Sequence, residues 1–207
     1  MRLDDFCDVV GFDVSRESLD KLQIYHDLLI KWQKAINLVS PSTLDVAWLR
    51  HFADSAQLAA HIPDHVQSVM DWGSGAGFPV AVLAILRPDL TFYAVESDGR
   101  KCQFMRSVSR ETFAPLRIEN TRIEALEGDV IPDLVTARAL APVEALLGYA
   151  ERFFTARPDF QMLLLKGETA QGEVDLARQD YDFDVVFLPS VTHPKAQILR
   201  LSNIVKR

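Results

Sequence analysis

A glycine-rich turn between two apolar runs constrains this chain more than any other feature. Residues 69–80 read VMDWGSGAGFPV, so Gly73, Gly75 and Gly77 fall within five positions. The turn follows a strand-like run and opens a helix-like one, which is the context in which glycine-rich motifs bind ligands. Glycine permits a tight turn and the close approach of a ligand to the backbone. We therefore expect a nucleotide-like ligand here, although ligand-free tight turns also contain glycine.

After this turn, short apolar runs alternate with longer amphipathic ones. We expect strands near residues 67–72, 90–96, 116–120, 133–138, 161–166, 183–188 and 196–204. We expect helices near residues 78–86, 99–113, 142–155 and 168–179. Strand–helix alternation indicates an α/β fold with a doubly wound parallel sheet. Only PSVTHP separates the last two strands, which is too short for a helical crossover, so the last strand is expected to be antiparallel.

The first sixty residues carry a helical pattern instead. Apolar residues recur there at intervals of three and four, as on one face of a helix: Leu22, Tyr25, Leu29, Trp32 and Ile36. Ser15 is a suitable N-cap for this helix. A second stripe follows the break at Pro41 and contains Leu44, Ala47, Trp48, Phe52, Ser55 and Leu58. We expect an N-terminal helical extension at residues 1–64 that packs on one compact unit at residues 65–207.

Composition and charge exclude several classes of protein. The 207 residues suit one domain, and no apolar run reaches the ~18 residues of a membrane helix. The N-terminus lacks the apolar core of a signal peptide. Cys7 and Cys102 lie far apart and match no zinc spacing, so we expect no metal site and a reducing, cytoplasmic environment.

The net charge of −7 argues against indiscriminate binding to naked nucleic acid. The charge is uneven, however. Residues 99–122 hold six basic and two acidic side chains, and residues 193–207 hold four basic side chains and no acidic one. These stretches are either solvated surface or places for a few phosphate groups.

A carboxylate at the end of the next predicted strand supports a nucleoside ligand. The segment LTFYAVE ends in Glu96, nineteen residues after Gly77. A carboxylate there can accept both hydrogen bonds of a ribose diol. It can also favour the N-terminus of the following helix, and the two roles are compatible.

The spacing of the turn favours methyl transfer over hydride transfer. Dinucleotide-binding turns usually read G-x-G-x-x-G, whereas this one reads G-x-G-x-G and follows Asp71. Together with a final antiparallel strand, the pattern resembles the class I S-adenosylmethionine-dependent methyltransferases, which have a Rossmann-like seven-stranded sheet. The resemblance implies S-adenosylmethionine as the cofactor, lying across the first strand ends.

Sequence motifs that the chain lacks narrow the choice of the atom that accepts the methyl group. A pyrimidine C5 needs a cysteine nucleophile, and Cys102 lies in the helical pattern RKCQFMR, away from the strand ends. Enzymes that methylate exocyclic amines usually show an Asn/Asp-Pro-Pro-aromatic turn after the fourth strand, where this chain reads TARALAP. A 2′-hydroxyl needs a general base, a role open to Lys166. An acceptor that is already nucleophilic, such as guanine N7, fits best.

Seven segments spread along the chain form a specific combination. They are KWQKAINLVS (31–40), RHFADS (50–55), DWGSGAGFP (71–79), ESDGRKCQFMR (96–106), NTRIEAL (120–126), ARALAP (137–142) and LLKG (164–167). With them the chain resembles the GidB (RsmG) family, the 16S ribosomal RNA guanine-N7 methyltransferases. The resemblance implies a substrate guanine in 16S ribosomal RNA, within the small ribosomal subunit or its assembly intermediate. We expect the enzyme to be a monomer.

The resemblance also assigns roles to residues on the cofactor side. Gly73 and Phe78 would contact the cofactor together with the other two glycines of the turn and Glu96. Ile123 and Glu124 would border its adenine, where an acidic side chain can accept from the adenine amine. Arg138 would lie at the junction of cofactor and target base, as the catalytic residue and a further cofactor contact.

On the substrate side, the resemblance implies that Asn37, Ser40, His51 and Lys166 bind the RNA, with Asp54 also flanking the pocket. His51 has a structural alternative, in which it joins two helices. Lys166 has the alternative of a solvated strand end.

Two positions depart from the family pattern, because Val80 replaces a frequent glycine and Ala137 replaces a usual serine. A small-molecule methyltransferase and a non-enzymatic binding protein stay open as alternatives, since a fold alone does not fix function. The two basic stretches favour the RNA methyltransferase.

Overall fold

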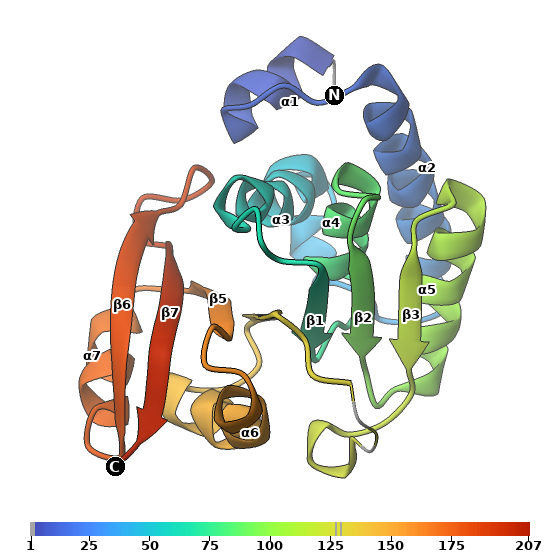
Figure 1. Ribbon diagram of the computed structural model, residues 1–207. Helices are drawn as coiled ribbons and strands as arrows, with labels where there is room; N and C mark the ends of the chain where they lie inside the picture. Colours follow the sequence, from blue (N-terminus) through green and yellow to red (C-terminus); the bar gives the residue numbers. More distant parts are fainter. Residues whose placement is uncertain (1–2, 127, 129) are drawn as a thin grey trace.

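A seven-stranded sheet forms the centre of the molecule (Figure 1). The computed structural model describes residues 3–126, 128 and 130–207. The strands are β1 (Ser68–Trp72), β2 (Thr91–Val95), β3 (Leu116–Glu119), β4 (Leu134–Arg138), β5 (Gln161–Lys166), β6 (Tyr181–Pro189) and β7 (Gln197–Lys206). Their order is β3-β2-β1-β4-β5-β7-β6; β1 to β5 pair in parallel, and β7 is antiparallel to both β5 and β6. The prediction of an α/β fold with an antiparallel last strand is confirmed.

Helices cover both faces of this sheet. They are α4 (Val80–Leu86), α5 (Gly99–Thr112), α6 (Val143–Ala156) and α7 (Ala170–Ala177), with the short helix η4 (Ile123–Ala125) before β4. Alternate strand residues face opposite layers. Val69 and Leu134 pack with α4 and α5, whereas the next residues along, Met70 and Val135, pack with α6 and α7. Central strands buried on both faces explain why the sequence shows continuous apolar runs rather than alternation.

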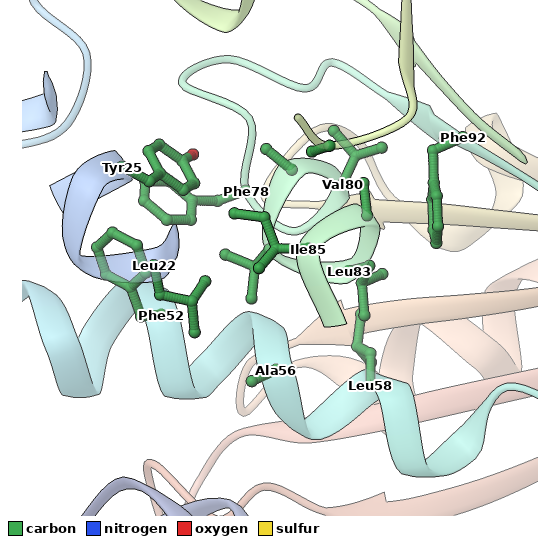
Figure 2. Packing of buried hydrophobic residues seen from close by; sticks show 14 of the residues in the cluster. Leu22, Tyr25, Phe52, Ala56, Leu58, Phe78, Val80, Leu83, Ile85 and Phe92 are labelled. Carbon is green, nitrogen blue, oxygen red and sulfur yellow. The ribbon is translucent and has the colours of Figure 1, made fainter. Parts of the chain in front are cut away.

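The N-terminal extension begins with α1 (Leu3–Val10) and α2 (Arg16–Gln33). Ser15 caps α2 as predicted, because its hydroxyl oxygen accepts from the Ser18 N–H at 3.0 Å. Residues Leu22, Tyr25 and Leu29 form the buried face of α2, which packs against α5 and α4. Figure 2 shows Leu22 and Tyr25 beside the side chains of α4.

The second predicted stripe does not form one amphipathic helix. It is divided into η1 (Pro41–Thr43), the π-helical η2 (Trp48–Ala53), α3 (Asp54–Ala56) and η3 (Gln57–His61). Residues 51–58 are all buried, so both faces of this segment are covered. One face packs on α4, as Phe52, Ala56 and Leu58 do in Figure 2. The other face contacts the loop between β6 and β7, where Gln57 accepts from the Val191 N–H at 2.9 Å.

The extension and the sheet share a hydrophobic core. A single cluster of buried side chains joins Phe6 and Leu22 of the extension to Leu83 of α4 and Phe92 of β2. The division into an N-terminal extension at residues 1–64 and one compact unit at residues 65–207 stays a prediction.

Candidate active site

The three glycines of the turn face three different surroundings. All have positive φ, at 64° for Gly73, 58° for Gly75 and 89° for Gly77, a region that other residues rarely adopt. A Cβ on Gly73 would lie 2.7 Å from Leu140 Cδ1, and one on Gly77 would lie 2.9 Å from the Tyr25 hydroxyl. At Gly75 the nearest atom would be the Gly73 carbonyl oxygen at 3.8 Å. The turn is therefore packed against protein at two positions and open toward a ligand at Gly75.

Two cavities meet at this turn. The larger, of about 640 Å³, lies between the carboxyl ends of β4 and β5 and the extension, and the smaller, of about 340 Å³, lies beside β2 and η4. Gly73, Gly75, Leu140 and Ala141 line both cavities. We term residues 139–142 the dividing loop, because they form the wall between the two spaces. Within the described residues, Gly77 lines neither cavity, and its packing against the Tyr25 hydroxyl accounts for its missing side chain.

Glu96 places a nearly buried carboxylate at the edge of the smaller cavity. Its Oε2 accepts from the Gly75 N–H at 2.8 Å, and its Oε1 accepts from the Asp98 N–H at 2.8 Å. Since a carboxylate has about four acceptor positions, each oxygen can still accept from a ribose hydroxyl. The cap of α5 is supplied by Asp98, whose side chain accepts from the Arg100 N–H at 2.8 Å.

The far wall of the smaller cavity comes from η4. Ile123 is half-buried there, and Glu124 is exposed and accepts from the Tyr149 hydroxyl at 3.1 Å. An apolar side chain beside a carboxylate suits a purine ring with an exocyclic amine. With the open backbone at Gly75 and the acceptor at Glu96, these residues fit the adenosine part of S-adenosylmethionine.

Arg138 ends β4 on the floor of the larger cavity. Its guanidinium carbon lies 5.3 Å from the centroid of the Phe78 ring, within reach of a cation–π interaction. Its Nη1 donates to the Arg50 carbonyl at 3.4 Å and His51 Nδ1 at 3.3 Å, and pairs with Asp54 Oδ2 at 3.4 Å. Arg138, predicted at the junction of cofactor and target base, is therefore hydrogen-bonded to the N-terminal extension. Phe78, predicted as a cofactor contact, lines the larger cavity.

His51 is held as a neutral imidazole by its neighbours. Because an arginine only donates, Nδ1 must accept from Arg138 and the proton must be on Nε2. Nε2 then donates to Thr43 Oγ1 at 2.8 Å, and the Thr43 hydroxyl donates to the Ser40 carbonyl at 2.7 Å. Burial, together with the charges of Arg138 and Arg50, lowers the pKa of His51 to about 4. The ring both joins segments of the extension to β4 and lines the larger cavity.

Asp54 extends this network to the loop between β6 and β7. Its Oδ1 accepts from the Thr192 hydroxyl at 2.7 Å and from Gln57 Nε2 at 3.1 Å. The carboxylate is nearly buried, so these partners and Arg138 offset its loss of hydration. Asp54 thus connects the extension, β4 and the β6–β7 loop at one point.

Lys166 at the end of β5 is not a solvated residue. Its Nζ donates to Glu173 Oε2 at 2.7 Å and to the Ala141 carbonyl at 2.5 Å, and its side chain is only 10% exposed. Burial acts to raise the pKa of Glu173, but hydrogen bonds from Lys166 and Thr169 lower it overall. Lys166 lines the larger cavity as an ion-paired side chain.

The other two predicted substrate contacts differ in placement. Ser40 lines the larger cavity, and its hydroxyl lies 3.0 Å from the Ser42 hydroxyl. Asn37 is exposed, and its Oδ1 accepts from Gln33 Nε2 at 3.3 Å. Among the residues described, Asn37 is absent from the lining of the larger cavity, and a substrate contact at either residue stays a prediction.

Comparison with known proteins identifies the family. A family model described as rRNA small subunit methyltransferase G matches residues 18–201. The chain belongs to this family. Proteins named Ribosomal RNA small subunit methyltransferase G include one from Rhodospirillum centenum, 50% identical over 198 residues, which are 95% of this chain and 89% of the relative. The protein of that name from Parvibaculum lavamentivorans is 46% identical over 196 residues, which are 93% of this chain and 86% of the relative.

Solved structures show the same fold at low sequence identity. A SAM-dependent methyltransferase from Aquifex aeolicus has a TM-score of 0.61 at 14% identity, covering 83% of this chain and 96% of that one. A chain of the fibrillarin/Nop5p complex has a TM-score of 0.56 at 15% identity, covering 75% of this chain and 82% of that one. The predictions of an rRNA methyltransferase family member, a class I fold and S-adenosylmethionine as cofactor are confirmed.

In this member of the rRNA small subunit methyltransferase G family, the acidic residue of the turn motif is buried. Asp71 Oδ1 accepts from the Thr136 hydroxyl at 2.7 Å across the β1–β4 pair. Burial raises the pKa of Asp71 to about 7, against the opposing effect of the hydrogen bonds from Ser74 and Thr136. Within the described residues, Asp71 lines neither cavity. Asp71 therefore contacts the glycine turn from inside the protein, where its backbone carbonyl accepts from the Ser74 hydroxyl at 3.1 Å.

The structure adds four residues that the sequence did not indicate. They are Arg50 at the larger cavity, Leu140 over Gly73, Glu173 beside Lys166, and Thr192 beside Asp54. Arg50 belongs to the RHFADS segment, but nothing in the sequence distinguishes it from an ordinary arginine on the surface. The other three act through partners at least seven residues away, and no local pattern marks them.

The described residues offer no metal centre and no activated cysteine. No three His, Cys, Asp or Glu side chains are grouped in them so as to hold a metal ion. Cys102 is buried, its Sγ donates to the Glu96 carbonyl at 3.3 Å, and burial raises its pKa. In the same part of the chain, no helix combines the length and apolarity needed to cross a membrane.

Proposed function

We propose that this protein transfers a methyl group from S-adenosylmethionine to N7 of one guanine in 16S ribosomal RNA. The observation that carries the proposal is the pair of cavities joined at Gly75, one suited to a nucleoside cofactor and the other to a planar base beside Arg138. When bound, the cofactor supplies an electrophilic methyl group on a sulfonium. Family membership favours ribosomal RNA over a small molecule as the acceptor.

The chemistry of N7 matches what the side chains can do. Guanine N7 has a free lone pair and carries no proton, so it would accept the methyl group directly from the cofactor held at Gly75 and Glu96. No proton has to be removed, so alignment is the main requirement. The structure has no evident proton acceptor at His51 or Lys166, because His51 Nδ1 accepts from Arg138 and the Lys166 ammonium is paired with Glu173. An acceptor atom that carries no proton is consistent with this.

Two arginines are suited to hold the acceptor. The contacts of the Arg138 guanidinium described above all use Nη1. We propose that its Nε or Nη2 donates to guanine O6, since guanidinium has five N–H donors. Arg50 is exposed at the larger cavity and, in the described part of the chain, takes part in no ion pair, which suits a phosphate.

Mass spectrometry of 16S ribosomal RNA tests the function directly. RNA from cells with and without the protein is digested, and the methylated fragments are compared. We expect one guanine to gain a single methyl group, at N7, only where the protein is present. Methylation at another atom would contradict the acceptor argument, and unmodified RNA with a methylated small molecule would favour the alternative function.

We further propose that the substrate is the folded small subunit or an assembly intermediate. A chain of charge −7 is repelled by RNA at long range, and several of its basic side chains are paired with acids, such as Arg110 with Glu111 and Lys195 with Glu168. A pre-folded particle presents the guanine without the entropy cost of ordering RNA. We propose that the enzyme acts as a monomer in the cytoplasm.

A tritium-transfer assay compares the two forms of substrate at ~0.15 M salt, where long-range electrostatic forces between protein and RNA are screened. We expect the particle to be methylated faster than protein-free 16S RNA at equal concentration. Equal rates would mean that the basic stretches hold naked RNA more strongly than the net charge suggests.

A further inference from the structure

Within the dividing loop, residues 139–142, Leu140 and Ala141 line both cavities together with Gly73 and Gly75 of the glycine turn. Leu140 of this loop lies directly over the turn, so close that a Cβ on Gly73 would meet its Cδ1 at 2.7 Å. The preceding residue, Ala139, has φ 51°. A non-glycine residue persists in this region only where the surrounding structure holds it. Something behind the loop must therefore fix it.

That support begins at the start of α6. The N-cap of this helix is Pro142, which has no side-chain acceptor, and the Val143 N–H is one of the donors that a helix leaves without an internal partner. Glu173 of α7 supplies the missing acceptor, because its Oε2 accepts from the Val143 N–H at 3.1 Å. The negative charge also suits a helix N-terminus.

Lys166 completes the support from β5. Its ammonium donates to the Ala141 carbonyl at 2.5 Å and to the same Glu173 oxygen at 2.7 Å. Thr169 holds the other Glu173 oxygen at 2.9 Å. The lysine and glutamate side chains are 10% and 20% exposed, so removing either partner leaves a largely buried charge unpaired. The C-terminal end of the loop is thus tied to β5 at Ala141 and to α7 at Val143.

We propose that Lys166 and Glu173 are positioning residues for the cofactor, which fix the dividing loop against the glycine turn, and that Lys166 does not bind RNA phosphate. The proposal rests on the proposed function for the identity of the cofactor. A phosphate at Lys166 would have to displace Glu173 from a short, shielded contact. The neighbouring Lys195–Glu168 pair provides the contrast, since its side chains are 63% and 71% exposed.

Calorimetry of S-adenosylmethionine binding without RNA tests this proposal. We expect Lys166→Met and Glu173→Gln each to weaken the affinity about tenfold, as the loss of a charged hydrogen bond does. The double variant should be no weaker than the worse single one, because the two residues act as one unit. Glu168→Gln is the matched control, which removes an equivalent but exposed pair and should change the affinity less than about twofold.

Two further measurements on the same variants separate positioning from other roles. Hydrogen exchange of the amides of Leu140, Ala141 and Val143 should quicken in Lys166→Met and Glu173→Gln without a matching change in β1. The salt dependence of RNA binding should keep its slope in both, since a lost phosphate contact would lower it by about 0.7–0.9.

Three results would overturn the proposal. Unchanged cofactor affinity in both single variants with a lower melting temperature would leave the pair a purely structural role. A smaller salt slope in Lys166→Met alone would make this lysine a phosphate contact. Additive losses in the double variant would mean that the two residues act separately. If the unaltered protein does not bind S-adenosylmethionine at all, the proposed function fails, and this proposal fails with it.

Discussion

The two cavities that meet at Gly75 are built in different ways. The smaller is lined mainly by Gly73, Gly75, the dividing loop and residues 95–97 and 121–124. The carboxylate of Glu96 is fixed there by two backbone N–H groups, those of Gly75 and Asp98. The larger depends on side chains from distant segments, in which Arg138 pairs with Asp54 and Asp54 accepts from Thr192. Backbone lines most of the cofactor side, where the charges of Lys166 and Glu173 contact only the backbone of residues 141 and 143, whereas side-chain charges line the acceptor side directly.

Because of this difference, we expect substitutions on the two sides to impair the protein in different ways. On the cofactor side, most of the shape comes from backbone, so the changes that should matter are those that fill space, remove Glu96 or release the dividing loop from Lys166 and Glu173. On the acceptor side, one lost charge leaves its buried partner unpaired. The following experiments test that contrast, beginning with the largest expected effect.

Gly75→Val should abolish S-adenosylmethionine binding, a loss of more than about a hundredfold by calorimetry. The valine side chain would enter the space that faces the ligand, and φ 58° is unfavourable for a β-branched residue. Gly77→Val is the matched comparison, because its side chain would strike Tyr25 and Ala81 inside the protein. We expect that variant to lose more thermal stability than Gly75→Val. Wild-type cofactor affinity in Gly75→Val would show that the turn was misinterpreted.

Arg138→Ala should reduce kcat/KM for methyl transfer by about a hundredfold while cofactor affinity changes less than about threefold. A bidentate contact to guanine contributes about 1–3 kcal/mol, and a misplaced acceptor can lose a further hundredfold. The measurement pairs a transfer assay on small subunits with calorimetry. Equal losses in both would make Arg138 a residue of the cofactor side.

Glu96→Ala should weaken S-adenosylmethionine binding by about tenfold to a hundredfold, because charged hydrogen bonds contribute about 1.5–3 kcal/mol. At saturating cofactor, methyl transfer should approach the wild-type rate, in contrast with Arg138→Ala. Calorimetry that finds unchanged affinity would remove Glu96 from the cofactor site.

The smallest expected effect concerns His51 and acid. Its pKa is lowered to about 4 by burial and by Arg138 and Arg50, whereas an unfolded histidine titrates near 6.5. The unfolded state therefore binds a proton first, and this contribution to stability is complete above pH 6.5 and is lost as the pH falls toward 4. Urea titration at pH 7 and at pH 5 gives the drop in unfolding free energy between the two values. We expect this drop to be about 1–2 kcal/mol smaller in His51→Gln than in the wild type. Equal drops would mean that the pKa of His51 is the same in the folded and unfolded states.

The sequence by itself determined the sheet and the cofactor side. The seven strands, the antiparallel last strand and the turn at Gly75 follow from apolar periodicity and from glycine, which are local signals. Glu96 could be placed because the end of one parallel strand lies beside the end of the next.

Only the tertiary structure decided the acceptor side and the contacts behind the dividing loop. The sequence predicted one apolar face for the second stripe, whereas residues 51–58 are covered on both faces by α4 and the β6–β7 loop. It left Lys166 between phosphate contact and solvated strand end, whereas the fold pairs it with Glu173. Such partners come from separate elements, and their meeting depends on how those elements pack. Packing leaves no local pattern in the sequence, because each partner alone is an ordinary charged residue of its own helix or strand.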